Sequence, residues 1–516
     1  MSPARVRRIH FVGIGGTGMS GLAEVLLTMK YEVSGSDLAR TEVTERLAAL
    51  GARVDLGHAA RNVAGADLLV FSSAVPRDNP EVREARRLGL PMLKRGEMLA
   101  EIMRLRYGIA VAGAHGKTTT TSLTGHLLAR AGLDPTVVVG GRLKMLGGNA
   151  RLGASRYLVA EADESDGSFL ELNPTIAVVT NVDREHLDHY RGLADIRRAF
   201  QKFMRQVPFY GLSIVCGDDP NVRLILGKMR KRVLTYGFGE GNVLRAVGVE
   251  PRGLEQRFLV QYHGRTLGEA VLSLPGRHNV LNALAAIAVG LELEIPELEC
   301  LRALEGFEGV GRRFELKGEG NGVRVIDDYG HHPTEVAAVL ATARSIHSGR
   351  LVVIFQPHRY SRTQALAREF AEVLRSVDLL ILADVYAAGE KPIHGVGSDL
   401  IVDQLQGFSD RQVIRVKDKA EALARVPAML LPGDLVLTLG AGDITRWGEP
   451  LLARYLDPNA PVGETGSPGD AHHDMTPRTG GSVTEEPAPA DRTSAMASPA
   501  PPHAALDIGA EGPIHA

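Results

Sequence analysis

The sequence predicts an α/β fold of three domains with mostly parallel sheets. Short apolar segments alternate with helical patterns along most of the chain, which is typical of βαβ units. Two glycine-rich turns, at 13–18 and 113–116, each lie between a strand-like and a helical segment, as in doubly wound sheets. The 516 residues are enough for about three domains of ordinary size.

Residues 1–106 form the first expected domain, which is Rossmann-like. Apolar runs predict strands at 8–14, 31–37 and 66–75, with a last short strand near Pro91. Helical periodicity predicts the intervening helices at 18–29, 42–50 and 79–88. Because strands and helices alternate, we expect a parallel, doubly wound sheet.

Residues 107–313 form the expected central domain, with a mostly parallel sheet. Its first strand, 107–112, leads through a glycine turn into an amphipathic stretch that stops at Gly132. Further strands are predicted at 156–163, 175–183 and 212–219. A strand-like insertion at roughly 233–275 precedes a helix predicted at 278–293.

Residues 314–456 form the third expected domain, again Rossmann-like. Its strands are predicted at 323–329, 350–356, 378–385, 412–416 and 434–442, separated by helical patterns. The remaining segment, 457–516, is rich in Pro, Ala, Gly, Ser, Thr and acidic residues, and no aromatic residue follows Tyr455. Such a segment buries too little apolar surface to offset its ordering entropy, so we expect a disordered tail.

Composition argues against several classes of protein. The 59 basic and 61 acidic residues nearly balance, so nothing indicates a nucleic-acid partner. Two cysteines, Cys216 and Cys300, form neither a disulfide framework nor a zinc site and fit a reducing compartment. No stretch reaches the length of a membrane span, and glycines interrupt the apolar run that follows Arg8, unlike in a signal peptide. We expect a cytoplasmic protein without membrane insertion and leave monomer or dimer open.

The run GAHGKTTTT, from Gly113 to Thr121, has the layout of a phosphate-binding loop. The N–H groups of such a turn and helix N-terminus point at an anion. Lys117 would reach the outer phosphates of a nucleoside triphosphate, and the Thr118 hydroxyl would bind magnesium. Only two residues separate Gly113 from Gly116, whereas the general motif has four before its Gly-Lys pair. The alternative is a structural turn with a solvated lysine; the flanking strand and helix favour a P-loop ATPase-type domain.

The first glycine turn matches a dinucleotide fingerprint. Gly13, Gly15 and Gly18 have the required spacing, and Asp37 ends the next strand about 20 residues further on. Read alone, this pattern predicts an NAD-dependent dehydrogenase. The physical requirement is only a diphosphate at a helix N-terminus and an acid near a sugar hydroxyl, which a UDP-sugar also meets. A structural unit without a ligand is the third possibility.

Acidic side chains gather where the strand 156–163 ends: Glu161, Asp163, Glu164 and Asp166. Carboxylates at this edge of a sheet, facing a phosphate loop, suit magnesium, which prefers oxygen ligands. The alternative is an acidic turn that stays solvated.

Two further polar groups are candidates for ligand contacts. Asn181, His186 and Asp188 lie near another strand end, where a lone histidine is equally often structural. Asn279 and Asn282 lie one turn apart on a helix face. Their amides could pair with an adenine edge, although Asn279 or the neighbouring His278 could simply cap the helix.

Two polar turns follow strands of the third domain, at 327–335 and 356–363. His358, Arg359 and Arg362 cluster basic groups at the edge where an α/β sheet binds ligands. Arginine suits bidentate binding of a carboxylate, and a surface basic patch is the alternative. Adjacent histidines seldom bind one ion, so we do not expect a metal site at 331–332.

Eight motifs in this order resemble the Mur ligases: GIGGTGMSG, GAHGKTTTT, EADESDGSF, GRHNVLNALAA, GVGRRFE, DDYGHHPTE, FQPHRYSRT and DVYAAGE. The resemblance covers about residues 8–456 and is specific because all eight motifs occur together. It implies successive domains for a UDP-sugar, ATP and an amino acid, and so favours UDP over NAD. It points to the branch that joins L-alanine to UDP-N-acetylmuramate through an acyl phosphate, with ATP and Mg²⁺.

The resemblance also implies residue roles. ATP would contact Gly113, Ala114, His115, Gly116, Lys117, Thr118, Thr119, Asn279, Asn282, Arg313 and Asp328, with Arg313 by the γ-phosphate and Asp328 near the ribose. Thr118 and Glu161 would hold one magnesium ion, and His186 would hold a second. The UDP-sugar would contact Gly15, Gly16, Gly18, Asp37, Ser72 and Ser73. The alanine carboxylate would bind His358, Arg359 and Arg362. Catalysis would depend on Lys117, His186, Arg313, His331 and Arg359, with His331 a candidate base for the amine.

Three other functions remain open. The nearest is the recycling ligase of the same family, which attaches a tripeptide to the same sugar and should lack QPHRYSRT. A folylpolyglutamate synthase shares the last two domains but has no use for the first glycine turn. A nucleotide-binding module without turnover would not need Lys117, Glu161, His186 and Arg313 together.

Overall fold

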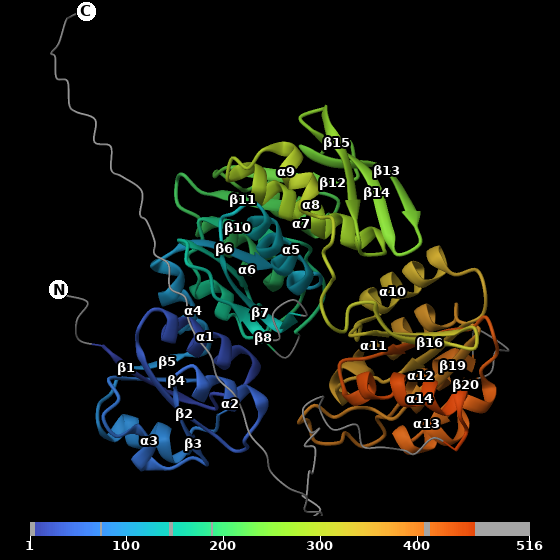
Figure 1. The fold of residues 1–516 in the computed structure, drawn as a ribbon, viewed down its shortest axis with the longest axis horizontal. Helices are drawn as coiled ribbons and strands as arrows, with labels where there is room; N and C mark the ends of the chain where they lie inside the picture. The colour runs from blue at the N-terminus through green and yellow to red at the C-terminus, as the bar shows by residue number, and fades with distance from the viewer. Residues whose placement is uncertain (1–5, 73–74, 144–147, 187–188, 407–412, 460–516) are drawn as a thin grey trace, which may run out of the picture. The chain divides into compact units, whose positions relative to one another are not determined.

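The computed structural model describes residues 6–72, 75–143, 148–186, 189–406 and 413–459. These residues form three β-sheets with helices packed against them (Figure 1). The expected disordered tail lies outside the described residues from residue 460 onward. Within these ranges, no helix combines the length and the apolar character needed to cross a bilayer.

The first sheet contains the strands β1 (Arg8–Val12), β2 (Glu32–Asp37), β3 (Arg53–Leu56), β4 (Leu68–Phe71) and β5 (Met92–Lys94). All pair in parallel in the order β3-β2-β1-β4-β5. Its helices are α1 (Thr17–Thr28), α2 (Glu42–Ala49), α3 (Pro80–Arg87) and α4 (Arg95–Arg104). Side chains of β1 alternate, so that Phe11 packs with α1 and Val12 packs with α3.

The central sheet contains β6 (Tyr107–Ala112), β7 (Thr136–Leu143), β8 (Gly148–Arg151), β9 (Tyr157–Glu161), β10 (Ile176–Val179), β11 (Leu212–Cys216), β12 (Val233–Gly237), β13 (Leu244–Arg252), β14 (Glu255–Tyr262) and β15 (Arg265–Leu272). The strand order is β15-β14-β13-β12-β11-β10-β6-β9-β7-β8. Neighbouring strands from β13 to β7 in this order pair in parallel. The strands β14 and β15 at one end of the sheet, and β8 at the other end, are antiparallel to their neighbours.

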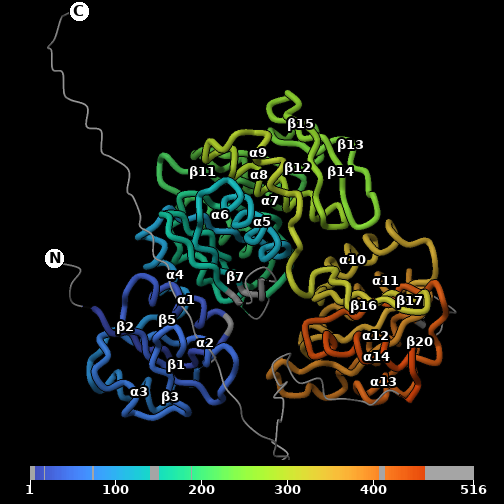
Figure 2. Tube along the Cα trace, viewed as in Figure 1, coloured from blue at the N-terminus to red at the C-terminus, as the bar shows by residue number. Residues whose placement is uncertain are grey.

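The helices of the central part are α5 (Lys117–Arg130), α6 (Leu193–Arg205), α7 (Pro220–Leu226), α8 (Arg277–Glu292) and α9 (Glu297–Arg302). Although α5 and α8 are far apart in sequence, they lie side by side and share one apolar core with the sheet (Figure 2). This packing brings the asparagines at the start of α8 to the phosphate-loop helix.

The third sheet contains β16 (Glu315–Gly320), β17 (Val323–Asp328), β18 (Leu351–Phe355), β19 (Leu379–Ala383), β20 (Val413–Val416) and β21 (Leu435–Leu439). Their order is β16-β17-β21-β18-β19-β20, and only β16 is antiparallel to its neighbour. The helices are α10 (Pro333–Ile346), α11 (Tyr360–Leu374), α12 (Asp399–Gln406), α13 (Lys419–Arg425) and α14 (Gly448–Leu456).

The predicted α/β class with mostly parallel sheets is confirmed. Nine helices and strands of the described residues were not predicted: β3, β7, β8, β16, α4, α6, α7, α9 and α14. Four of them are strands at or next to a sheet edge, and in β3 and β16 partly exposed polar residues interrupt the apolar pattern. The helix α4 directly follows a three-residue strand, so its start was hidden in the sequence.

Candidate functional site

The phosphate loop joins the buried strand β6 to α5, which begins at Lys117. Gly113 and Gly116 have φ angles of 145° and 82°, which favour glycine. A Cβ atom at Gly113 would overlap the Thr180 hydroxyl, and one at Gly116 would lie 2.6 Å from Asn282 Oδ1. The glycines are therefore required by close packing as well as by backbone conformation.

Lys117 is held inside this loop. Its Nζ donates to the carbonyls of Gly113 at 2.7 Å and Ala114 at 3.2 Å and to Glu164 Oε1 at 2.8 Å. Burial disfavours the charged lysine, but the nearby Glu164 carboxylate outweighs burial and raises the pKa of Lys117. The lysine thus remains a cation inside the loop, and its contact with a phosphate stays a prediction.

Hard oxygen ligands lie next to the loop. Thr118 Oγ1 donates to Glu161 Oε1 at 2.6 Å. His186 Nε2 lies 3.4 Å from Glu164 Oε1 and 3.6 Å from Glu185 Oε2. Ligand atoms of Glu164, Glu185 and His186 fall within 4.8 Å of one another.

These residues fit magnesium. Glu164 Oε2 is a buried acceptor without a hydrogen-bond partner among the described residues. An unsatisfied buried carboxylate oxygen beside a second carboxylate and an imidazole is a donor set that a divalent cation would complete. Asp188, the third candidate after β10, lies outside the described residues.

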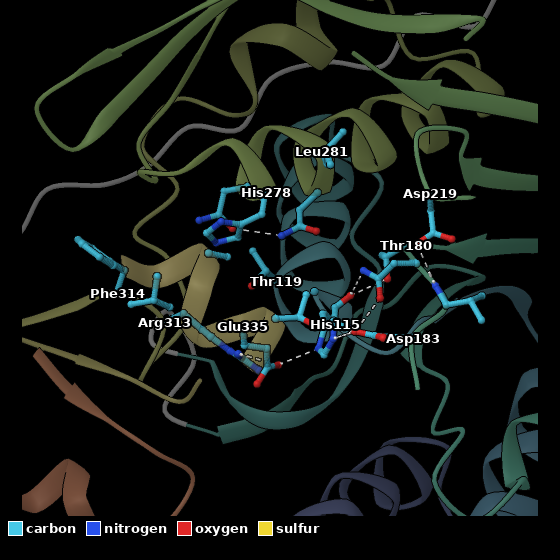
Figure 3. A pocket seen from close by; sticks show the side chains of 18 of the residues that line it. His115, Thr119, Thr180, Asp183, Asp219, His278, Leu281, Arg313, Phe314 and Glu335 are labelled. Carbon is cyan, nitrogen blue, oxygen red and sulfur yellow. Dashed lines mark hydrogen bonds and ion pairs between the residues drawn. The ribbon is translucent and has the colours of Figure 1, made fainter. Parts of the chain in front are cut away.

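A cavity of about 380 Å³ extends from the phosphate loop to the third sheet (Figure 3). Its volume is in the range of small-molecule sites. It is lined by seven of the predicted ATP contacts: His115, Gly116, Thr119, Asn279, Asn282, Arg313 and Asp328. The structure therefore brings together residues from the loop, from α8 and from the third sheet.

The two asparagines of α8 are already engaged with the protein. Asn279 donates to the Pro275 carbonyl at 2.7 Å and accepts from Asn282 at 3.1 Å. Asn282 Oδ1 accepts from the Thr120 hydroxyl at 3.1 Å. These bonds fix the amides against α5, and their contact with adenine stays a prediction.

His115 joins the phosphate loop to α10. Its Nε2 lies 3.0 Å from Asp183 Oδ2, and its Nδ1 lies 3.2 Å from Glu335 Oε1. Burial opposes protonation of His115, but hydrogen bonds to these two carboxylates outweigh it and raise its pKa to about 10. Thr334 of α10 also donates to Asp183 Oδ2, at 2.8 Å. Figure 3 shows His115 between the two acids.

Arg313 and Asp328 form the wall of the cavity on the side of the third sheet. Arg313 Nη1 lies 4.0 Å from Glu335 Oε1, and its guanidinium lies over the Tyr329 ring at 5.1 Å. Asp328 accepts from the N–H groups of Phe314 at 2.8 Å and Gly330 at 2.7 Å. Burial raises the pKa of Asp328 to about 6.

The predicted amino-acid site forms one cluster at the edge of the third sheet. The rings of His331 and His358 lie 5.6 Å apart, and Arg362 Nη1 lies 3.3 Å from His358 Nδ1. Burial lowers the pKa of His331 to about 3, and burial with nearby Arg362 lowers that of His358 to about 4. Both rings are neutral at neutral pH. A pKa of about 3 makes His331 a weak proton acceptor, so its role as base stays a prediction.

Arg359 has an unusual backbone. Its φ is 72°, a strained value for a residue with a side chain, and its N–H donates to the Tyr386 carbonyl at 2.8 Å. Strain of this kind persists only where the surroundings impose it, and it clusters at functional sites.

Asp37 forms a hydrogen bond with the glycine turn that follows β1. Asp37 Oδ2 accepts from the Gly15 N–H at 2.8 Å, so the carboxylate supports the turn. A Cβ atom at Gly18 would lie 2.8 Å from the side chain of Arg95, which contacts Asp163 Oδ2 at 3.1 Å. A cavity of about 370 Å³ is lined there by Gly18, Arg95, Asp163 and neighbours. Ser72 directly follows β4 and is half-buried, Gly16 is exposed, and Ser73 lies outside the described residues.

Sequence reasoning gave no role to four residues of this site: Asp183, Glu185, Glu335 and Arg95. Three of them belong to polar motifs that follow strands, so strand-end position was the available signal. Arg95 starts a helix that was not predicted, and nothing local marks it.

Three family models match successive parts of the chain. "Mur ligase family, catalytic domain" matches residues 8–107, "Mur ligase middle domain" 111–290, and "Mur ligase, glutamate ligase domain" 312–442. The chain belongs to the Mur ligase family. The resemblance in its motifs is thereby confirmed.

Relatives and solved structures of this Mur ligase agree with that assignment. UDP-N-acetylmuramate–L-alanine ligases of Geobacter sp. and Nitratidesulfovibrio vulgaris are 53% and 55% identical to it, each over 87% of this chain and 98% and 99% of the relative. A UDP-N-acetylmuramate-alanine ligase structure from Thermotoga maritima has a TM-score of 0.72 at 32% identity, covering 87% and 99% of the two chains. A murein peptide ligase from Psychrobacter arcticus has the same fold, with a TM-score of 0.63 at 23% identity and the same coverage.

Proposed function

We propose that this protein joins L-alanine to UDP-N-acetylmuramate, with conversion of ATP to ADP and phosphate, in the synthesis of peptidoglycan precursors. The observation that carries the proposal is an identity of 52–55% to relatives named UDP-N-acetylmuramate–L-alanine ligase, over nearly their whole length. The family models that match residues 111–290 and 312–442 contain all the residues that line the cavity.

The proposal assigns one substrate to each part of the chain. Residues 1–106 bind the UDP-sugar through Gly15, Gly16, Gly18, Asp37, Ser72 and Ser73. Residues 107–313 bind ATP, and residues 314–456 bind the amino acid. The cavity between the phosphate loop and α10 supports this order because it joins the second part to the third. The tail has no assigned role, and we place the enzyme in the cytoplasm.

The first step activates a carboxylate. A lactyl carboxylate oxygen attacks the γ-phosphorus of ATP, an acyl phosphate forms, and ADP leaves. Two anions must approach, so positive charge at the site lowers the barrier. Lys117, a cation inside the loop, and Arg313, at the wall of the cavity, supply it. Magnesium held by Thr118, Glu161 and His186 would neutralise further phosphate charge.

The second step forms the amide. The neutral amine of L-alanine attacks the acyl carbonyl, and phosphate leaves with the electrons of the C–O bond. His358, Arg359 and Arg362 bind the alanine carboxylate, which orients the amine. His331 is beside this cluster, with its ring Nδ1 3.1 Å from the Tyr329 carbonyl, and is the candidate acceptor of the amine proton. Holding three reactants in line is the main contribution of the protein.

The rival within the family is the recycling ligase. A UDP-N-acetylmuramate:L-alanyl-γ-D-glutamyl-meso-diaminopimelate ligase from Neisseria meningitides is 32% identical over 60% of this chain, whereas the alanine ligases of Geobacter sp. and Nitratidesulfovibrio vulgaris are 53% and 55% identical over 87% of it. The test is to incubate the protein with ATP, Mg²⁺ and UDP-N-acetylmuramate and measure phosphate release with single amino acids or the tripeptide. Release with L-alanine is expected. Release with the tripeptide and none with L-alanine would refute the proposal.

A further inference from the structure

Glu335 divides its two carboxylate oxygens between two sites. Oε1 faces the nucleotide cavity, 3.2 Å from His115 Nδ1 and 4.0 Å from Arg313 Nη1. Oε2 faces the amino-acid cluster, where it accepts from the N–H groups of His331 at 3.0 Å and His332 at 3.3 Å. Oε2 also lies 3.3 Å from His331 Nδ1. One rigid group therefore contacts residues of both sites.

Glu335 is mostly buried and negatively charged. Its side chain is only 11% exposed. Burial favours the neutral acid, but the hydrogen bond and charge of His115 and the charge of Arg313 help to hold the pKa of Glu335 well below its usual range. A buried carboxylate of this kind holds its partners firmly, because loss of the charge would leave cations without compensation.

A purely structural role would be that of a helix cap. Glu335 is the third residue of α10 and reaches back to the N–H of His332, which forms a capping box. That role needs Oε2 alone. The contact of Oε1 with His115, 220 positions away in the chain, does nothing for the cap. His115 is moreover held on both ring nitrogens, by Glu335 and by Asp183, so its orientation in the loop depends on both acids.

We propose that Glu335 is a positioning residue that couples the nucleotide site to the amino-acid site, by fixing His115 and Arg313 on one side and His331 on the other. The proposal deepens the proposed function and rests on it. The Glu335 carboxylate then helps to keep the phosphate loop and the alanine cluster in one relative position, as attack on the acyl phosphate requires. Loss of the carboxylate therefore weakens the use of ATP and of L-alanine together.

The variant Glu335→Gln tests this, because glutamine keeps the size and one acceptor but removes the charge. A matched control is Glu421→Gln, since Glu421 accepts the Lys417 N–H at 2.8 Å at the start of α13, has a side chain that is 38% exposed, and lies outside the cavity. Steady-state phosphate release is measured against ATP, L-alanine and UDP-N-acetylmuramate, and mant-ADP binding and thermal unfolding are measured in parallel.

For Glu335→Gln we expect kcat to fall at least tenfold and the KM values for ATP and L-alanine both to rise at least threefold. The KM for UDP-N-acetylmuramate should stay within twofold, as should every constant of Glu421→Gln. A Glu335→Gln enzyme that loses only thermal stability would show that Glu335 is a cap. A change confined to one of the two substrates would also overturn the coupling. If the unmodified protein releases no phosphate in response to L-alanine, the proposed function is refuted instead. In that case, unchanged mant-ADP binding by Glu335→Gln would refute the contribution of Glu335 to the nucleotide site.

Discussion

Replacing Lys117 by methionine should destabilise the protein as well as inactivate it. Lys117 is the cation beside Glu164, whose side chain is 3% exposed, while that of the lysine is 19% exposed. Removing one member of a buried ion pair costs about 3–5 kcal/mol. The partial exposure of Lys117 lowers the expected loss of unfolding free energy to about 2–4 kcal/mol.

A second substitution separates stability from activity. Glu164→Gln in the same chain removes the unpaired charge, so the double variant should regain stability to within about 1 kcal/mol of the wild type. Activity should not return, because the transferring phosphate has still lost its cation. Loss of one such electrostatic contact lowers turnover by about 10²–10³-fold.

Calorimetric unfolding and phosphate release test both parts. At about 2–4 °C per kcal/mol for a domain of this size, Lys117→Met should unfold about 4–16 °C below the wild type. His186, whose Nε2 lies 3.4 Å from the same Glu164 oxygen, is the other group that could compensate the carboxylate. A Lys117→Met protein as stable as the wild type, or a double variant that releases phosphate normally, would refute the reasoning.

Four further changes probe other parts of the site. Gly113→Ala, with φ at 145° and Cβ against the Thr180 hydroxyl, should cost about 2–5 kcal/mol in urea unfolding; wild-type stability would contradict this. Glu161→Gln should raise the Mg²⁺ concentration for half-maximal activity by about tenfold or more, and an unchanged Mg²⁺ titration would remove it from the metal site. Arg359→Lys should raise the KM for L-alanine about 10–100-fold but not that for ATP. Asp328 has a pKa of about 6 in the fold, above the value of about 3.9 in the unfolded chain, so stability should fall by up to about 3 kcal/mol as pH rises from about 4 to 6. Asp328→Asn should abolish that slope in thermal unfolding measured across this pH range.

Local motifs made much of the site predictable. Lys117 and Thr118 could be assigned because a strand, a glycine turn and a helix are consecutive in the chain. Asp37 was found in the same way, from a fixed distance after the first glycine turn. Its bond to the Gly15 N–H could not be foreseen, because it depends on the pairing of β1 with β2.

Partners that lie far apart in sequence were missed for a physical reason. Glu164 was recognised as one acid among four, but its ion pair with Lys117 depends on the parallel pairing of β6 with β9. Glu335 ends a recognised motif, yet its contact with His115 exists only after two sheets have folded. Periodicity and spacing report which residues follow strands, but not which strand ends meet.

Backbone strain is the property that a sequence hides most completely, and four of the ten non-glycine residues with positive φ among the described residues lie at or next to the site. His186, Arg312, Phe314 and Arg359 all have φ angles between 49° and 72°, although none is glycine. Glycine would relieve the strain, which costs about 1–3 kcal/mol at each position. His186 faces Glu164, and the Arg312 guanidinium donates to the Gly440 carbonyl at 2.6 Å. A side chain is retained at these positions in spite of the strain because its contacts contribute more than glycine would recover. Other strained residues, such as Asn321, lie in surface turns, where relief by glycine should be tolerated.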